Sequence, residues 1–253
     1  MDRDAADPRL TGEYVRRLGS DDSGDDASDG VADDATDHVG DVTLVGVVHN
    51  HPASKHRIRA VLDEVDPAVL GLELPPVAVP LYDFDADDWR TPPCFGGEMS
   101  TAIQAAATDR VVGIDGPDPG FVVRLVRNLL GEDASLSTAR SVLSSLAGVT
   151  KRAVGCRLAA AVARTIGVRF DVSDPAAHDC SWADPPMAQA RDERAQVERA
   201  RTIAETFEQP ATARVRDRTR DQHMASRLSD LRQEGDVVAV VGIAHLDPVC
   251  ERL

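Results

Sequence analysis

The chain has 253 residues, 42% of them hydrophobic but only 4% aromatic, and a formal net charge of -15 at pH 7. This length is enough for one domain with a substantial core. The acidic balance excludes a non-specific nucleic-acid binder, because such a protein needs a basic surface that displaces counterions. The sequence contains no secretory signal and no apolar run long enough for a membrane span, so we expect neither.

About half of the net charge lies in residues 1–38, which are rich in Asp, Ser and Gly. Such a segment buries too little apolar surface to offset its chain entropy, so we interpret it as a disordered acidic leader. Within it, residues 8–17 are able to form a short helix or an arm that docks on the body. Order is expected from residue 39, and residues 39–253 are predicted to form a single domain.

The choice of charged residues is informative about the environment. Lysine occurs only at Lys55 and Lys151, all other cations are arginine, and Asp far outnumbers Glu. This composition resembles that of halophilic archaeal proteins, in which acidity maintains solubility in concentrated salt. The four cysteines form no C-x-x-C pair, which is typical of buried thiols in a reducing cytoplasm. We therefore expect a cytoplasmic protein.

The first half of the domain reads as alternating strands and helices. Residues 41–49 form an apolar, β-branched run typical of a buried parallel strand. Residues 54–65 predict a helix with Ser54 as N-cap, and residues 68–74 predict the next strand. A strand–helix–strand unit of this kind implies parallel strands and a right-handed crossover.

The second half continues this alternation with longer helical stretches. Residues 75–96 predict a long irregular loop, which is often functional beside a sheet. The remaining predicted elements are a helix at 97–108, a strand at 110–115, two or three helices within 119–166, a short strand or extended connection at 167–172, two helices within 185–234 broken near Pro210, and a last strand at 237–242. The fold class is therefore α/β, with a mainly parallel central sheet flanked by helices and a long helical segment before the last strand. That helical segment could pack on the body or mediate a homodimer.

Two valine-rich strands end in the same pattern, G-x-x-H. His49 closes the first copy and His245 closes the last, while Glu73 and Asp115 follow the two strands between them. In open α/β sheets, ligands bind beyond the carboxyl ends of the strands. His49, Glu73 and His245 therefore predict either a site for a divalent metal such as Zn, Mn or Co, or an acid–base pair that activates water. The alternatives are that each histidine caps its strand and that Asp115 only forms a turn.

The helix before the last strand carries two charges at inward-facing positions. Met224, Leu228 and Leu231 form an apolar stripe, and Arg220 and Asp221 precede it by one turn on the same face. Arg220 could orient a carbonyl or carboxylate group, and Asp221 could hold a histidine. The alternative is a salt bridge at the helix entry.

Other polar residues give weaker signals. His51 could be a ligand but is more typical of a loop residue before a proline, and Arg124 could point toward the same cleft. The remaining residues are interpreted as surface residues: His56, His178, His223, Arg214, Arg216 and Arg218.

At this point the sequence resembles the TraB family, which belongs to a wider group with the Tiki proteases, the erythromycin esterases and the ChaN-like haem-binding proteins. The resemblance covers about residues 40–253. It rests on GVVHNHPAS (46–54), GLEL (71–74), VVGIDGPDPGFVVRL (111–125), RDQHMASRL (220–228) and VVAVVGIAHLDPV (237–249).

The resemblance implies an esterase-like or ChaN-like α/β fold in which His49, Glu73, Arg220 and His245, with Asp115, line one cleft. Such a set supports metal-dependent peptide hydrolysis in Tiki-like members and metal-free activation of water in the esterases. Two features depart from the family pattern. Gly116 stands where an arginine is usual, and the C-terminal membrane helices of long archaeal relatives are missing, which favours a stand-alone version.

Three hypotheses about function follow. The first is a metal-dependent hydrolase of a peptide or another acyl compound, in which Glu73 or a histidine activates water and Arg220 stabilises the oxyanion. The second is a regulator that binds a peptide or small ligand in the same cleft without turnover. The third is carriage of haem or a metal. The sequence names neither the substrate nor the metal.

Overall fold

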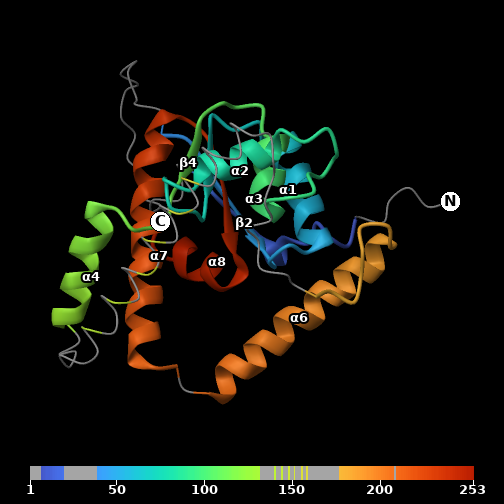
Figure 1. Ribbon diagram of the computed structural model, residues 1–253. Helices are drawn as coiled ribbons and strands as arrows, with labels where there is room; N and C mark the ends of the chain where they lie inside the picture. Colours follow the sequence, from blue (N-terminus) through green and yellow to red (C-terminus); the bar gives the residue numbers. More distant parts are fainter. Residues whose placement is uncertain are drawn as a thin grey trace, which may run out of the picture.

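The computed structural model describes residues 7–19, 39–131, 177–207 and 209–253, together with six single helical positions between 140 and 158. Its centre is a five-stranded sheet with the order β1-β2-β5-β3-β4 (Figure 1). The strands are β1 (Val15–Leu18), β2 (Val42–Val47), β3 (Val69–Leu72), β4 (Val111–Gly113) and β5 (Val237–Gly242). All neighbouring strands are parallel except β1, which pairs antiparallel with β2 at the edge.

Helices cover both faces of this sheet (Figure 1). They are α1 (Pro52–Val65), α2 (Val79–Ala86), α3 (Gly97–Ala105), α4 (Pro119–Gly131), α6 (Pro186–Thr206), α7 (Ala211–Leu231) and α8 (Ile243–Cys250), with short 3-10 turns at Gly12–Tyr14 and Arg232–Glu234. The predicted fold class is confirmed at this level: an α/β fold with a mostly parallel sheet, flanking helices and the long α6 before β5.

The alternation of side chains along β5 divides the core into two layers. Val237, Ala239 and Val241 pack with residues of α7 and α8, whereas Val238 and Val240 pack with α1 and α3. Each of these five side chains is fully buried. A strand that is apolar on both faces occupies the middle of a sheet that is covered on both sides, which explains why β5 reads as an unbroken valine run.

The central place of β5 determines where the site forms. Val47 at the end of β2 pairs with Gly242 at the end of β5. On the other side of β5, the backbone N–H of Glu73 donates to the carbonyl of Val240 at 3.0 Å. The carboxyl ends of β2, β5 and β3 therefore lie side by side. Of these three strands, β5 comes last in the sequence but lies between the other two in the sheet.

Several local predictions need correction. The helix α1 begins at Pro52, and its N-cap is His51 rather than Ser54, because the ring of His51 accepts the backbone N–H of Ala53. The predicted loop at 75–96 contains α2, which begins at Val79. Residues 8–17 do dock on the body, but as a 3-10 turn and the edge strand β1 rather than as a helix. Residues 132–139 and 159–176, which include the predicted strand at 167–172, lie outside the described residues.

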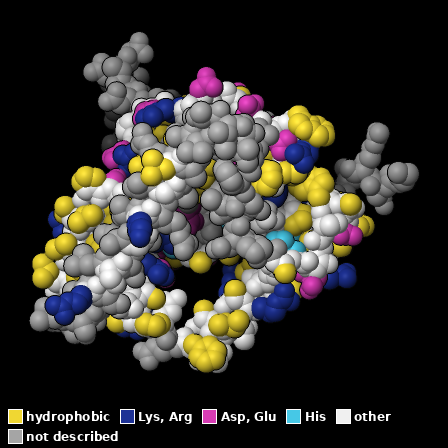
Figure 2. All heavy atoms as spheres, in the orientation of Figure 1, with side chains coloured by type: hydrophobic (Ala, Val, Ile, Leu, Met, Phe, Trp, Pro, Cys, Tyr) yellow, Lys and Arg dark blue, Asp and Glu magenta, His cyan; other side chains and the backbone are white. Residues whose placement is uncertain are grey.

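The predicted break in the long helical segment is confirmed, since α6 ends at Thr206 and α7 begins at Ala211. Only the N-terminal half of α6 is anchored: Gln189, Asp192, Glu193 and Val197 are buried, whereas residues 198–207 are exposed. Figure 2 shows the C-terminal half of α6 standing away from the body. No helix in the described ranges is both long and apolar enough to cross a membrane.

Candidate active site

The sheet brings the predicted strand-end residues to one edge. His49 follows β2 by two residues, Glu73 follows β3 directly, and His245 lies in the first turn of α8. The fourth predicted residue, Arg220, reaches this edge from the middle of α7. Asp115 arrives from the end of β4 and completes the group.

Arg220 is the centre of a cluster of hydrogen bonds. Its Nη2 donates to Oε1 of Glu73 in a short contact and to Oδ2 of Asp115 at 3.0 Å, and its Nε contacts Oδ2 of Asp115 at 3.2 Å. Its Nη1 contacts Nε2 of His245 at 2.9 Å. Burial disfavours the charged guanidinium, but Asp115 and Glu73 outweigh this effect and raise the pKa of Arg220. The predicted group of Glu73, Asp115, Arg220 and His245 is therefore assembled around a permanent positive charge.

The proton positions on His245 follow from these contacts. A guanidinium can only donate, so the contact with Arg220 requires a lone pair on Nε2 of His245. The ring proton then lies on Nδ1 and is donated to Oδ1 of Asp221 at 2.6 Å. Burial lowers the pKa of His245, but Asp221 and Glu73 raise it more, so its net pKa is above the ordinary value. A second proton on this ring would displace the contact with Arg220.

The glycine at the end of β5, Gly242, lets the backbone approach Glu73 closely. The backbone N–H of Gly242 donates to Oε2 of Glu73 at 2.5 Å. A Cβ atom at position 242 would lie 3.3 Å from the same oxygen and would push the carboxylate away. Both oxygens of Glu73 are thus held, one by Gly242 and one by Arg220, in a side chain that is only 12% exposed.

His49 has a different environment from its counterpart His245. Its Nδ1 contacts Oε1 of Glu98 at 2.8 Å, and the other oxygen of Glu98 accepts the backbone N–H of Asn50 at 2.8 Å. Burial raises the pKa of Glu98, but the hydrogen bonds from His49 and Asn50 bring it below the ordinary value. An ionised Glu98 accepts the Nδ1 proton, so the lone pair of His49 is on Nε2. Sequence reasoning missed Glu98, whose only signal was a carboxylate at the start of the helix after the loop.

A pocket of about 300 Å³ connects these groups. Its described lining residues are Val47, His49, Glu73, Leu74, Tyr82, Gly96, Glu98, Met99 and Gly242. About half of the His49 side chain is exposed, whereas Glu98 is buried beneath it. Among the described residues of this lining there is no serine, threonine, cysteine or lysine, so the polar groups it offers are the imidazole of His49, the carboxylates of Glu73 and Glu98, and Tyr82.

The predicted metal ligands do not fit a metal ion in this arrangement. Metal ligation requires lone pairs that converge on one point, with neutral imidazole nitrogens and carboxylate oxygens. Here Nε2 of His245 and Oε1 of Glu73 both face the guanidinium of Arg220, which already supplies the positive charge. A divalent ion at this point would have to displace Arg220.

In the described part of the chain, one group does have the spacing of a metal site, and it lies elsewhere. His51, His178 and Asp192 each offer a ligand atom, and these atoms all lie within 4.8 Å of one another. His51 lies directly before Pro52 at the N-cap of α1, as a loop residue would, but it is fully buried. His178 is half-buried rather than on the surface. Their neighbourhood links the start of α1 with the start of α6.

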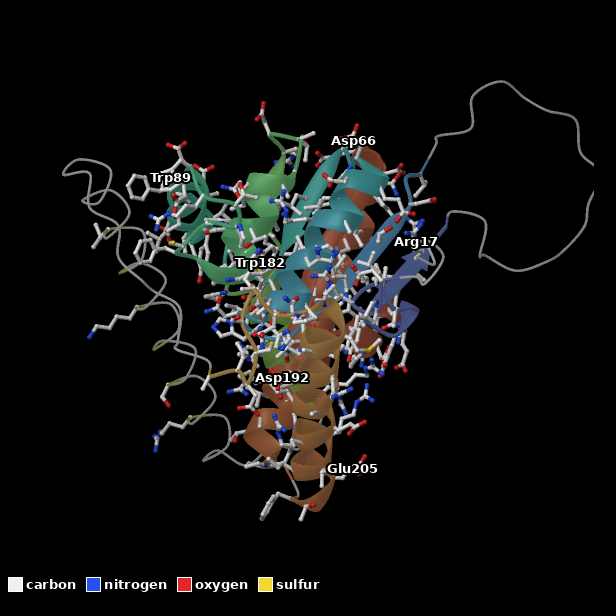
Figure 3. All side chains as sticks on the ribbon, turned by 90° about the vertical axis from the view of Figure 1, so that its right-hand side faces the viewer. Arg17, Asp66, Trp89, Trp182, Asp192 and Glu205 are labelled. Atoms are coloured by element: carbon white, nitrogen blue, oxygen red, sulfur yellow. The ribbon has the colours of Figure 1, made fainter. Side chains whose placement is uncertain are left out.

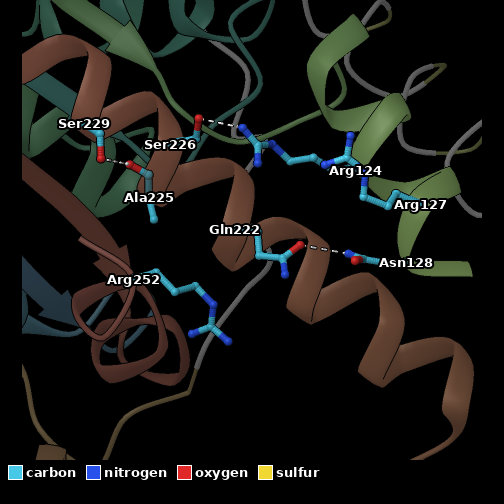
Figure 4. Close-up of a pocket in the computed structure, with 8 residues that line it drawn as sticks. All are labelled: Arg124, Arg127, Asn128, Gln222, Ala225, Ser226, Ser229 and Arg252. Carbon is cyan, nitrogen blue, oxygen red and sulfur yellow. Dashed lines mark hydrogen bonds between the residues drawn. The ribbon is translucent and has the colours of Figure 1, made fainter. Parts of the chain in front are cut away.

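Other predicted positions are now placed. Arg124 does not point toward the active site, because its Nη2 donates to Oγ of Ser226 at 2.6 Å in a separate pocket between α4, α7 and the C-terminus (Figure 4). His223 is buried against the ring of Phe121 rather than exposed. His56 is half-buried beside Asp7. Arg214, Arg216 and Arg218 are exposed, as predicted, and Met224, Leu228 and Leu231 are buried.

Comparisons with protein-family models, with curated proteins and with solved structures found no match for this chain. Any function must therefore be argued from the geometry of the site.

Proposed function

We propose that this chain is a hydrolase that activates water for attack on an acyl compound, such as a peptide or an ester. The observation that carries the proposal is the contact between His49 and Glu98, at 2.8 Å, on the wall of a pocket shared with Glu73. A histidine whose Nδ1 is held by a buried carboxylate is a suitable general base through Nε2. The described lining residues include no serine, threonine, cysteine or lysine, which favours direct attack by water.

The charge changes during the reaction are compatible with these residues. Nε2 of His49 takes a proton from the attacking water, and the imidazolium that forms is stabilised by the negative charge of Glu98. The same proton then passes to the leaving amine or alcohol. Glu73 orients the water, because an ionised carboxylate accepts hydrogen bonds but cannot donate them. The hydroxide adds to the acyl carbon, and the leaving group departs with its bonding electrons and the proton from His49.

Arg220 has a positioning role in this mechanism. A guanidinium has five N–H donors, and the bonds to Glu73, Asp115 and His245 engage Nε, both protons of Nη2 and one of Nη1. Arg220 therefore holds Glu73 in place and compensates its charge. This differs from the first hypothesis drawn from the sequence, in which Arg220 stabilises the oxyanion.

The test is a hydrolysis assay in concentrated KCl with a panel of peptide and ester substrates. We expect His49→Ala and Glu98→Gln each to lower kcat/KM by roughly 10²- to 10⁴-fold, the range for loss of a general base or of its orientation. His56→Ala, which changes a histidine outside the pocket, serves as the control. Equal activity in the wild type and in His49→Ala would contradict the proposal. Activity that requires added Zn, Mn or Co and is lost in His245→Ala would instead support the metal-dependent version.

A second candidate is a binding protein that uses the same pocket without turnover. The hydrogen bonds of Arg220 favour this candidate, because its guanidinium already binds Glu73, Asp115 and His245 within the protein. A bound peptide or small ligand recovered intact after long incubation would support this candidate. Stoichiometric release of a hydrolysis product would exclude it.

A further inference from the structure

A second group of reactive side chains lies outside the proposed active site, where the segment before α6 meets the start of α1. The nitrogen atoms of His51 and His178 and a carboxylate oxygen of Asp192 lie within 4.8 Å of one another. Sγ of Cys180 is 3.6 Å from Nε2 of His51. Figure 3 labels Asp192 on α6 and, higher in the same view, Trp182, which belongs to the same loop as Cys180. Two imidazoles, a thiol and a carboxylate thus share one partly buried location.

One nitrogen of this group lacks a hydrogen bond. Nδ1 of His178 contacts the side-chain amide of Gln196, at 2.9 Å from Nε2 and 3.2 Å from Oε1. Nε2 of His178 is buried and has no hydrogen-bond partner among the described residues. A buried polar atom without a partner is costly, and in native proteins such an atom often marks a bound water or ion. The shorter contact, from Nε2 of Gln196, fits a lone pair on Nδ1, so metal ligation through Nε2 requires the ring proton to move to Nδ1 and to be donated to Oε1 of Gln196 instead.

Several donors converge on a single carboxylate oxygen in this group. Oδ2 of Asp192 accepts from Nε2 of His51 at 3.2 Å and from Nε2 of Gln196 at 3.0 Å. Two side-chain donors therefore compete for one oxygen of Asp192, and the sulfur of Cys180 lies beside one of these donors, His51.

We propose that His51, His178, Cys180 and Asp192 bind one Zn²⁺ ion. Zinc prefers four ligands from this set of nitrogen, sulfur and oxygen atoms, whereas Mg²⁺ and Ca²⁺ prefer oxygen alone. The ion displaces the thiol proton of Cys180, and the two anionic ligands then balance its charge. Tetrahedral zinc separates its ligand atoms by roughly 3.4 Å, close to the 3.2 Å between His51 and Asp192. Because four protein ligands leave no open position, the site is structural rather than catalytic.

One existing bond opposes zinc binding. Nδ1 of His51 accepts the backbone N–H of Ala53 at 3.1 Å, so the ring proton is on Nε2. Ligation through Nε2 moves this proton to Nδ1, and the N-cap bond of α1 is then lost. We therefore expect weaker zinc binding than in a site whose histidines already have their protons in place.

The zinc ion would join α6 and the loop before it to the segment that carries the proposed general base. His51 is two residues from His49, with Asn50 between them in a left-handed conformation at φ 57°. Cys180 and Asp192 belong to the loop and the helix whose far half, residues 198–207, is exposed. Zinc would thus fasten the start of α6 to the segment that carries the general base. Zinc binding itself does not depend on the proposed hydrolase activity, so the two proposals fail separately.

The test is a metal titration of the full chain in concentrated KCl after treatment with a chelator. Co²⁺ is added first, because a cobalt–thiolate bond gives a charge-transfer band in the near ultraviolet, and Zn²⁺ then competes for the site. We expect one equivalent to bind and the thiolate band to be lost in Cys180→Ser. We expect His178→Ala to weaken zinc binding by at least roughly 100-fold, the upper end for loss of an outer-sphere partner. Cys250→Ser, which removes a thiol outside the group, should behave as the wild type.

Two results would overturn the proposal. The first is a wild-type chain that binds zinc no more tightly than His178→Ala, and the second is a thiolate band that persists in Cys180→Ser. Because a variant could fail to fold, one further test uses the wild type alone. Its thermal unfolding is measured with saturating Zn²⁺ and with chelator. A higher Tm with zinc supports the site, because a ligand that binds only the folded chain stabilises it. An unchanged Tm counts against it.

Discussion

The substitution Arg220→Met tests whether the positive charge at the centre of the active site also holds the fold together. Methionine has a similar length but no charge, so it removes the compensation of Glu73 and Asp115, whose side chains are both 12% exposed. Each carboxylate then retains a backbone hydrogen bond, from Gly242 and from Gly116 respectively. Removing one partner of a buried ion pair costs about 3–5 kcal/mol. Because 24% of the Arg220 side chain is exposed, we expect the lower end, about 3 kcal/mol.

The assay is thermal and urea unfolding at constant high salt. For a domain of this size, about 3 kcal/mol corresponds to a Tm lower by roughly 6–12 °C. The matched control is Arg110→Met, which breaks a two-bond ion pair with Glu234 whose side chains are 53% and 44% exposed. An exposed pair of this kind contributes about 0–1 kcal/mol. The reasoning would be refuted if Arg220→Met and Arg110→Met lowered the free energy of unfolding equally. It would also be refuted if the difference between the two variants stayed the same at acidic pH, where the carboxylates are protonated and no longer need a positive partner.

Two further effects on stability follow from other buried charges. Arg57→Met should cost about 3–5 kcal/mol in urea unfolding, because Arg57 and Glu193 form an ion pair that is 0% and 1% exposed; a loss below that of Arg110→Met would contradict this. The lowered pKa of Glu98 stabilises the fold at pH values above the ordinary glutamate pKa of about 4.3, and this contribution is lost as the pH falls through the lower, folded-state pKa. The difference in unfolding free energy between the wild type and Glu98→Gln should therefore be largest near neutral pH and become smaller on acidification. A difference that grew on acidification would mean that the pKa of Glu98 is raised rather than lowered on folding.

The edge where the site forms could be predicted from local patterns. Valine runs that end in glycine and then histidine require buried parallel strands, and parallel strands place their carboxyl ends at one edge. Arg220 and Asp221 were predictable for a related reason, since charges on an apolar helix stripe need partners. The partners themselves were not predictable. The alternative for Asp115 illustrates this: it forms the turn with Gly116 and also bonds to Arg220.

The two histidines of the repeated G-x-x-H motif show most clearly what a sequence pattern cannot predict. Their sequences are alike, but His49 meets Glu98 from α3, whereas His245 meets Asp221 and Arg220 from α7. Local patterns predicted the parallel strands, most of the helices, their buried faces and the edge of the sheet, because these depend on periodicity and on the residues next to each other in the chain. They did not predict the edge strand β1 or the helix α2. Only the tertiary structure decided which carboxylate orients which histidine, that Arg220 stands where a metal was expected, and that His51, His178, Cys180 and Asp192 gather beside α6. Those pairings join residues up to 147 positions apart, and the free energy of a charge depends on such neighbours and on burial rather than on local sequence.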